Sequence, residues 1–312
     1  MLTPQFSVII AAFNAERTVA AAVHAALAQT RADLEVIVVD DGSEDRTAAV
    51  VEQIGDPRVR VLRQSNRGPA AARNAGISAS RGKYLAFLDS DDLWLPGYLG
   101  LAGAALDRTE NPGFAYTDAY AFDALSGKVR RQTAMEPMRP PIPPPPDREQ
   151  FLLELIQRNF VYGSTTVPRR VLDHVGGWDD AQVQAEDYEL WLRILTAGYN
   201  PVWIPGQHAL YRLHAGQRHG DEVRMCSDLL SMYARLSLQS MPTAAHREVL
   251  ARRCRELERE LRVVRGDDRI RWALRQLRHR AGRVRQRVGL GDSWHEHPPA
   301  EVAAAFPDLA SI

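Results

Sequence analysis

The sequence predicts an α/β fold in which a parallel sheet is covered by helices on both faces. In the first third of the chain, four runs of apolar, largely β-branched residues alternate with helical patterns. The runs are almost continuously apolar, as expected for strands that are buried on both faces. With 312 residues, 45% of them hydrophobic, the chain is long enough for one sizeable core and an appendage, or for two small domains.

The first half is expected to consist of consecutive strand–helix pairs. The predicted strands are Phe6–Ala12, Leu34–Val39, Arg58–Leu62 and Tyr84–Leu88, and the predicted helices are Glu16–Gln29, Asp45–Ile54, Pro69–Ala79 and Pro96–Leu106. Ligands of such sheets bind beyond the carboxyl ends of the strands. The polar side chains that follow these strands are therefore the first candidates for a site: Asn14, Asp40, Asp41, Asp89 and Asp91.

The regular alternation ends after a predicted strand at Tyr116–Phe122. Residues 137–146 contain seven prolines, which cannot join a ladder of strands and favour an extended surface connection. Further along, we expect helices at Arg148–Arg158 and Glu186–Ala197, an extended segment at Val161–Val167, and strands at Pro201–Ile204 and His208–Leu213.

From about residue 221 the pattern is helical. Apolar residues recur at 4-3-4-3 spacing in two stretches, 250–264 and 270–288, separated by Gly266–Asp268. Residues 1–220 carry 22 basic and 26 acidic side chains, residues 221–312 carry 17 and 13, and Arg269–Arg287 contains eight arginines and no acid. We therefore expect one domain over 1–220 and a helical, Arg-rich extension over 221–312.

Three interpretations of the basic helices stay open. They could contact an anionic membrane surface, pair with a second copy of the chain through residues 221–290, or pack back onto the first domain. Nucleic acid is not an expected partner, because no basic face pattern or recognised motif is present.

The sequence predicts a cytoplasmic location. Cys226 and Cys254 form no disulfide framework, no signal-peptide pattern precedes the first strand, and no window approaches 18 apolar residues. If the basic helices contact a membrane, the protein would be peripheral at its inner face.

The most informative segment is Leu88–Asp92, where a buried strand ends in three carboxylates. Side chains at i and i+2 of an extended segment project to the same side, so Asp89 and Asp91 can converge on one point. Carboxylate oxygens suit Mg²⁺ or Mn²⁺, ions that substrate phosphates usually complete. The segment by itself would also fit a solvated acidic loop.

Six motifs, in order, resemble those of the inverting family 2 glycosyltransferases, which have the Rossmann-like GT-A fold. The resemblance covers roughly residues 5–215 and is carried by Ser7–Asn14, Val38–Ser43, Asn66–Gly76, Leu88–Asp92, Gly177–Asp180 with Glu186–Asp187, and Tyr211–His214. It implies a metal-dependent enzyme that moves a sugar from a nucleoside diphosphate sugar, with UDP favoured, to a hydroxyl of a saccharide or lipid-linked acceptor. Such an enzyme would take part in the synthesis of polysaccharide, glycolipid or another cell-surface glycan.

The resemblance also divides the first domain into a nucleotide-sugar-binding half, 1–110, and an acceptor-binding half, 111–220. In the first half, Asn14 belongs to the nucleotide loop, and Asp40 or Asp41 is expected to contact the base. Arg73 would bind a pyrophosphate or a base carbonyl, unless it only pairs with an acid. Asp89 would contact the ribose or the water shell of the metal.

Two residues are expected to hold the Mg²⁺ or Mn²⁺ ion. Asp91 would ligate the metal directly, and His214 would close over the phosphates as a further ligand.

In the second half, Asp187 is the expected base that takes the proton of the acceptor hydroxyl. Acids in the first turn of a helix also complement its macrodipole, which would explain Asp187 and Glu186 without catalysis. Glu186 is expected to orient the acceptor or a loop. Trp178 would be a platform for a sugar ring or a cover of the core. The alternative function is a non-catalytic nucleotide-sugar-binding or scaffold protein that acts through its helical tail.

Overall fold

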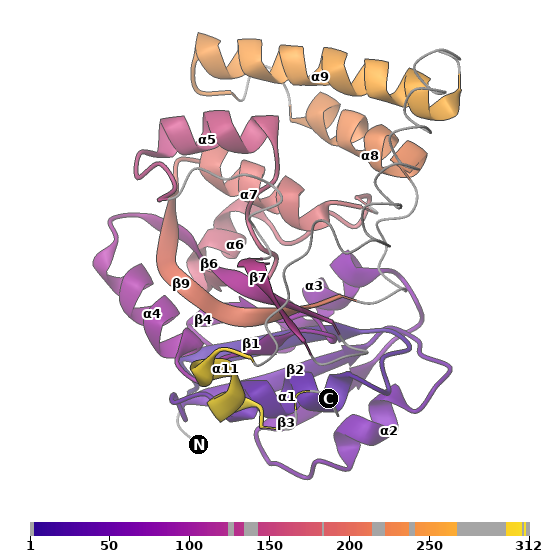
Figure 1. Cartoon of the computed structure of the whole chain (residues 1–312), viewed down its shortest axis with the longest axis vertical. Helices are drawn as coiled ribbons and strands as arrows, with labels where there is room; N and C mark the ends of the chain where they lie inside the picture. The colour runs from indigo at the N-terminus through magenta and orange to yellow at the C-terminus, as the bar shows by residue number, and fades with distance from the viewer. Residues whose placement is uncertain are drawn as a thin grey trace.

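The computed structural model describes residues 3–123, 128–133, 143–182, 184–213, 222–236, 241–266, 298–307 and 309. Among these residues, nine strands form one mixed sheet in the order β3-β2-β1-β4-β8-β6-β9-β5, with β7 paired to β6. Figure 1 shows helices on both sides of this sheet.

The first half of the sheet is parallel, as predicted. β1 (Phe6–Ala12) pairs with β2 (Leu34–Asp40) and with β4 (Tyr84–Phe87), and β2 pairs with β3 (Val59–Arg63). The connecting helices are α1 (Val19–Leu27), α2 (Thr47–Glu52), α3 (Pro69–Ala79) and α4 (Tyr98–Arg108). A Cβ at Gly76 would lie 2.5 Å from a side-chain carbon of Ile9, so glycine is what allows α3 to pack this closely on β1.

The second half of the sheet differs from the prediction. The short strand β8 (Thr166–Pro168) is antiparallel and lies between β4 and β6 (Pro112–Asp123). Two predicted strands form one long strand, β9 (Asn200–Leu213), which stays paired to β6 through shifts of register around Asp118. Two further strands were not predicted, β5 (Leu93–Trp94) and β7 (Val129–Thr133).

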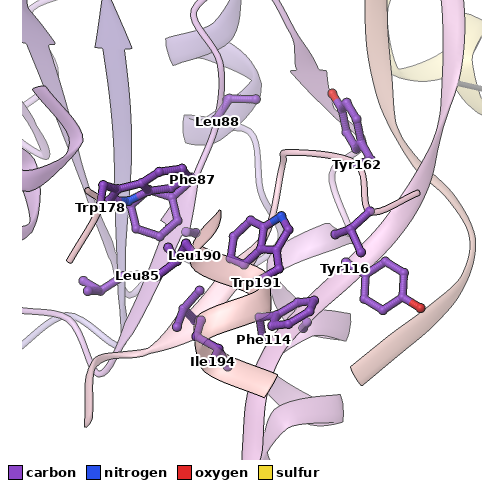
Figure 2. Packing of buried hydrophobic residues seen from close by; sticks show 14 of the residues in the cluster. Leu85, Phe87, Leu88, Phe114, Tyr116, Tyr162, Trp178, Leu190, Trp191 and Ile194 are labelled. Carbon is purple, nitrogen blue, oxygen red and sulfur yellow. The ribbon is translucent and has the colours of Figure 1, made fainter. Parts of the chain in front are cut away.

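The largest hydrophobic cluster joins the sheet to several helices, among them α7 (Glu186–Thr196), the helix that carries Asp187. Figure 2 shows Trp191 of α7 between Phe114 of β6 and the ring of Trp178. Trp191 is fully buried, and the ring centroids of these two pairs are 4.8 and 5.9 Å apart. Burying a large apolar side chain contributes about 1.5–3 kcal/mol to stability. The burial of Trp191 therefore anchors α7, including its first turn, against the sheet.

The first part of the C-terminal extension packs back onto this cluster. α9 (Ala244–Arg265) lies over both α5 (Arg148–Gln157) and α8 (Glu222–Arg235), as Figure 1 shows at the top of the molecule. The hydroxyl of Tyr233 on α8 donates to the carbonyl of Ile156 and lies 2.6 Å from the hydroxyl of Tyr188 on α7. α8 and α9 thus pack onto the first domain, as one of the three interpretations expects, while membrane contact and pairing with a second copy stay predictions.

The last described residues return to the opposite end of the molecule. α11 (Ala300–Ala305) buries Val302 beside Ala25 of α1 and Leu210 of β9, and Glu301 accepts a hydrogen bond from Tyr120. The second apolar stretch, 270–288, and the whole arginine run, Arg269–Arg287, lie outside the described residues. Within the described part of the chain, no helix combines the length and the apolar character needed to cross a membrane.

Candidate active site

The candidate site lies at the carboxyl ends of β1, β2 and β4, where two loops are joined by hydrogen bonds. The backbone N–H of Asn14 donates to the hydroxyl of Ser43, and the side-chain oxygen of Asn14 accepts from the N–H of Glu44. Asn14 adopts φ 50°, a left-handed conformation that asparagine tolerates better than most residues. Asn14 therefore holds the β1 and β2 loops at a fixed separation.

Asp41 is used by the protein itself. Its carboxylate accepts hydrogen bonds from the side-chain amide of Gln64 and from the backbone N–H groups of Arg67 and Gly68, at 2.7–2.9 Å. Gly68 is the N-cap of α3, so Asp41 fixes the start of that helix.

Only one of the two carboxylate oxygens of Asp40 accepts a hydrogen bond from the described residues. Its Oδ1 accepts from the N–H of Ser43 at 3.0 Å, and the structure gives no hydrogen bond to its Oδ2 among the described residues. Of the two aspartates left open by the sequence, Asp40 is thus the one with an oxygen that accepts no hydrogen bond from the described residues, whereas both oxygens of Asp41 are engaged.

Phe13, the aromatic residue between the β1 strand and Asn14, is not among the residues predicted for the site. Its side chain is 44% exposed, which makes it one of two exposed large hydrophobic residues in the described part of the chain. An exposed ring next to Asn14 in the chain offers a stacking surface for a planar group. The signal in the sequence was a large aromatic residue in a loop at the carboxyl end of a strand.

Arg73 connects the two halves of the site. Its guanidinium donates to Asp89 and to Glu186, each at 2.8 Å, and lies over the ring of Trp178 at 4.4 Å. Burial alone would lower the pKa of Arg73, but the charges of Asp89 and Glu186 outweigh this effect and raise it. With its side chain 11% exposed and both acids bonded, Arg73 is placed to position these carboxylates.

Trp178 lies in the core. It is 4% exposed, its edge meets Phe87 at 5.2 Å, and Arg73 covers one face. The backbone of Trp178 is held by Asn74, which accepts from its N–H and donates to its carbonyl. In this structure the ring covers the core and supports Arg73, and it presents no open face to a sugar.

Asp187 lies in the first turn of α7 with one oxygen engaged. Its Oδ1 accepts from the N–H of Tyr188 at 2.7 Å. The residue before the helix, Ala185, has φ 58°, a conformation that a residue with a Cβ adopts at a cost. Burial, and then the charge of Glu186, raise the pKa of Asp187 to about 7, while the Tyr188 N–H and Arg73 act in the opposite direction. A carboxylate with this pKa is well matched to a general base at neutral pH.

The loop that carries Asp91 is clamped from two sides. The buried carboxylate of Asp92 accepts from the hydroxyl of Tyr162 and from the N–H of Arg212, whose Nε donates to the carbonyl of Asp91. Burial, and then the charges of Asp91 and Asp89, raise the pKa of Asp92 well above its usual value. Asp92 and its two partners thus fix the loop that carries Asp89 and Asp91 against the end of β9, a role that the sequence did not reveal.

Carboxylates such as those of this loop are donors of the type that suits a divalent cation, but the described residues alone do not assemble a metal site. Burial, and then the charges of Asp92, Asp89, Asp91 and Asp187, raise the pKa of Tyr211. In the described part of the chain, no group of three or more His, Cys, Asp and Glu side chains is arranged to hold a metal. His214, the other predicted ligand, lies outside the described residues.

Comparisons with known proteins agree on one family. Residues 7–176 match the description "Glycosyl transferase family 2", and residues 158–238 match "Glycosyl transferase family group 2". The succinoglycan biosynthesis protein ExoO of Rhizobium meliloti is 34% identical over 219 residues, which cover 68% of this chain and 62% of ExoO. The Escherichia coli protein WfaP, named as a UDP-Glc:α-D-GlcNAc-diphosphoundecaprenol β-1,3-glucosyltransferase, is 30% identical over 67% of this chain and 78% of its own length.

Solved structures resemble this chain in fold. The crystal structure of S. aureus TarS 1-349 in complex with UDP-GlcNAc has a TM-score of 0.61 and 17% identity over 80% of this chain and 71% of that chain. The mannosyltransferase PcManGT from Pyrobaculum calidifontis, in complex with GDP-Man and Mn²⁺, has a TM-score of 0.58 and 17% identity over 81% and 70%.

Proposed function

Because this chain belongs to glycosyl transferase family 2 and has the GT-A fold, we propose that it is an inverting enzyme that transfers a sugar from a UDP-sugar to a hydroxyl acceptor. The observation that carries the proposal is the placement of Asp187. This carboxylate, with a pKa raised to about 7, lies in one charged cluster with Asp89 at the carboxyl end of β4. That arrangement supports a base on one side of a reacting sugar and a diphosphate on the other.

The donor would be bound by the first half of the domain. Asp40 would accept the N3–H of a uracil through its Oδ2, and Phe13 would stack on the base. Asp89, oriented by Arg73, would accept hydroxyl groups of the ribose. The relative WfaP is named for UDP-Glc, and TarS was solved with UDP-GlcNAc, which makes UDP-glucose and UDP-GlcNAc the first donors to test.

The reaction would be a single displacement at the anomeric carbon. Asp187 takes the proton of the acceptor hydroxyl as the new carbon–oxygen bond forms, and the bond to the diphosphate breaks with its electron pair leaving on the nucleotide. Asp91 and His214 would hold Mg²⁺ or Mn²⁺, which when bound stabilises the charge of the leaving diphosphate. One displacement inverts the configuration of the sugar.

The acceptor class follows from the relatives. WfaP is named for a diphosphoundecaprenol-linked α-GlcNAc acceptor and ExoO for succinoglycan biosynthesis. We propose a lipid-linked saccharide as the acceptor here, in the assembly of a cell-surface polysaccharide. Such an acceptor would bring the enzyme to the inner face of a membrane as a peripheral protein.

The experiment is a transfer assay with UDP-glucose or UDP-GlcNAc, Mn²⁺ and a synthetic α-GlcNAc-diphosphoryl lipid. We expect release of UDP and a product whose new linkage is β, as determined by NMR, since the donor is α-linked. The Asp187→Asn variant should bind the donor and fail to turn over. A product with retained configuration would contradict the proposed base.

A further inference from the structure

Residues 160–168 form a buried segment that is interrupted at one position. Each residue from Phe160 to Pro168 is buried except Gly163, which is partly exposed. The segment ends in β8, and its one partly exposed residue, Gly163, lies beside the carboxylates of Asp187 and Asp89.

The second oxygens of the two carboxylates meet over this glycine. A Cβ placed on Gly163 would lie 3.5 Å from Oδ2 of Asp187 and 3.8 Å from Oδ2 of Asp89. The Oδ1 atoms are both engaged elsewhere, with the N–H of Tyr188 and with the guanidinium of Arg73. Each carboxylate therefore uses one oxygen to hold its position and directs the other toward the same small space.

We propose that Gly163 is a specificity-determining residue, whose missing side chain leaves the slot in which the acceptor hydroxyl meets Asp187. This inference rests on the proposed function and adds the place where the acceptor reacts. A hydroxyl that donates to Asp187 must lie about 2.6–3.2 Å from its oxygen. A methyl group at position 163, in van der Waals contact with that oxygen, would occupy part of this approach. A ring hydroxyl, which brings its carbon and the neighbouring ring atoms with it, is hindered more than a water molecule.

The test is the Gly163→Ala variant. The two contacts that its Cβ would make are ordinary van der Waals distances to the ends of side chains, so the fold should tolerate it. The matched control is Gly97→Ala, because a Cβ at Gly97 would meet nothing within 4 Å. The assay uses UDP-glucose or UDP-GlcNAc, whichever the wild type turns over, with Mn²⁺. It measures transfer to the α-GlcNAc-diphosphoryl lipid and, in parallel, hydrolysis of the donor by water.

In Gly163→Ala we expect transfer to fall by about 10- to 200-fold, the range that one methyl group is worth in a tight pocket. In the same variant, the rate of donor hydrolysis and the increase in Tm caused by UDP should remain within about twofold of the wild type. Gly97→Ala should match the wild type in every measurement. If the transfer rate of Gly163→Ala is unchanged, or falls only in proportion to the hydrolysis rate, the proposal that Gly163 leaves space for the acceptor hydroxyl is wrong. A wild-type enzyme that transfers neither sugar to this acceptor would instead refute the proposed function, on which the inference rests.

Discussion

Replacing Asp187 by asparagine should change activity and stability in opposite directions. The substitution keeps the shape of the side chain, and an asparagine oxygen can still accept the N–H of Tyr188 that Asp187 accepts at 2.7 Å. What it removes is a negative charge that burial and the neighbouring Glu186 make unfavourable.

The size of this effect follows from the pKa. The pKa of Asp187 rises from 3.8 to about 7 on folding, and each unit corresponds to about 1.4 kcal/mol, so the charged form costs at most about 4 kcal/mol above neutral pH. Asp187 keeps some contact with water, which screens its charge and brings the expected cost to roughly 2 kcal/mol. Between pH 4 and 7 the folded protein binds the proton and the unfolded chain releases it, so the contribution of Asp187 to stability falls as the pH rises through this window.

The assay compares the free energy of unfolding of the wild type and Asp187→Asn from pH 4.5 to 8.5. The advantage of the variant should be small at the acid end, grow toward pH 7 and then stay constant, with a gain in Tm of roughly 2–4 °C per kcal/mol. Turnover of the variant should fall by about 10²–10⁴-fold, and the wild-type rate should increase with pH through an apparent pKa near 7. The control is Asp173→Asn, because Asp173 is exposed on α6 (Arg169–Val175). A stability difference that does not change with pH, or a variant that keeps its turnover, would refute the reasoning.

Three further predictions concern binding and packing. Asp40→Asn should weaken UDP binding, as measured by titration, with a small change in Tm. Asp41→Asn should instead lower the free energy of unfolding, as measured with denaturant, by about 1–3 kcal/mol, because three hydrogen-bond donors lose a charged acceptor. Arg73→Gln should lower the free energy of unfolding, measured with denaturant, by about 3–5 kcal/mol, because it leaves a buried ion pair broken. Tyr233→Phe should cost about 1–3 kcal/mol through the lost bond to a buried carbonyl, and unfolding should remain a single transition if α8 shares the core of the first domain.

The sequence was most informative where structure is local. The strand–helix pairs from β1 to α4 follow from apolar runs and helix signals within single segments, and the GT-A fold that the motifs implied is confirmed. The division of the chain at residue 220 stays a prediction, although α8 and α9 pack into the main hydrophobic cluster.

The missed elements depend on distant partners. β5 has two residues, too few to show any period, and exists because Leu93 pairs with Leu210. β8 is antiparallel because the chain returns from α5 to fill the gap between β4 and β6, which no local pattern specifies. Gly163 lies in the segment that the sequence predicts as extended. Its sequence neighbours do not indicate that Asp187 and Asp89, which are distant in the chain, face it.

The candidate site shows the same limit. The residue types at the strand ends were identified, but which oxygen of each is engaged was not, because Arg73 and Glu186 are separated by 113 positions in the chain. The choice between Asp40 and Asp41 likewise depended on backbone N–H groups more than 20 residues away.

The hydrogen bonds of Arg73 explain why its guanidinium does not prevent the pKa of the proposed base, Asp187, from being raised. One arginine serves three carboxylates here, and its hydrogen bonds go to Asp89 and Glu186. Its attraction for Asp187 is then weaker than the effects of burial and of Glu186, so the pKa of Asp187 rises instead of falling. A direct ion pair with Asp187 would have held its proton affinity too low for a base. The arrangement therefore orients the two neighbouring carboxylates, and leaves to Asp187 the proton affinity that the proposed reaction needs at neutral pH.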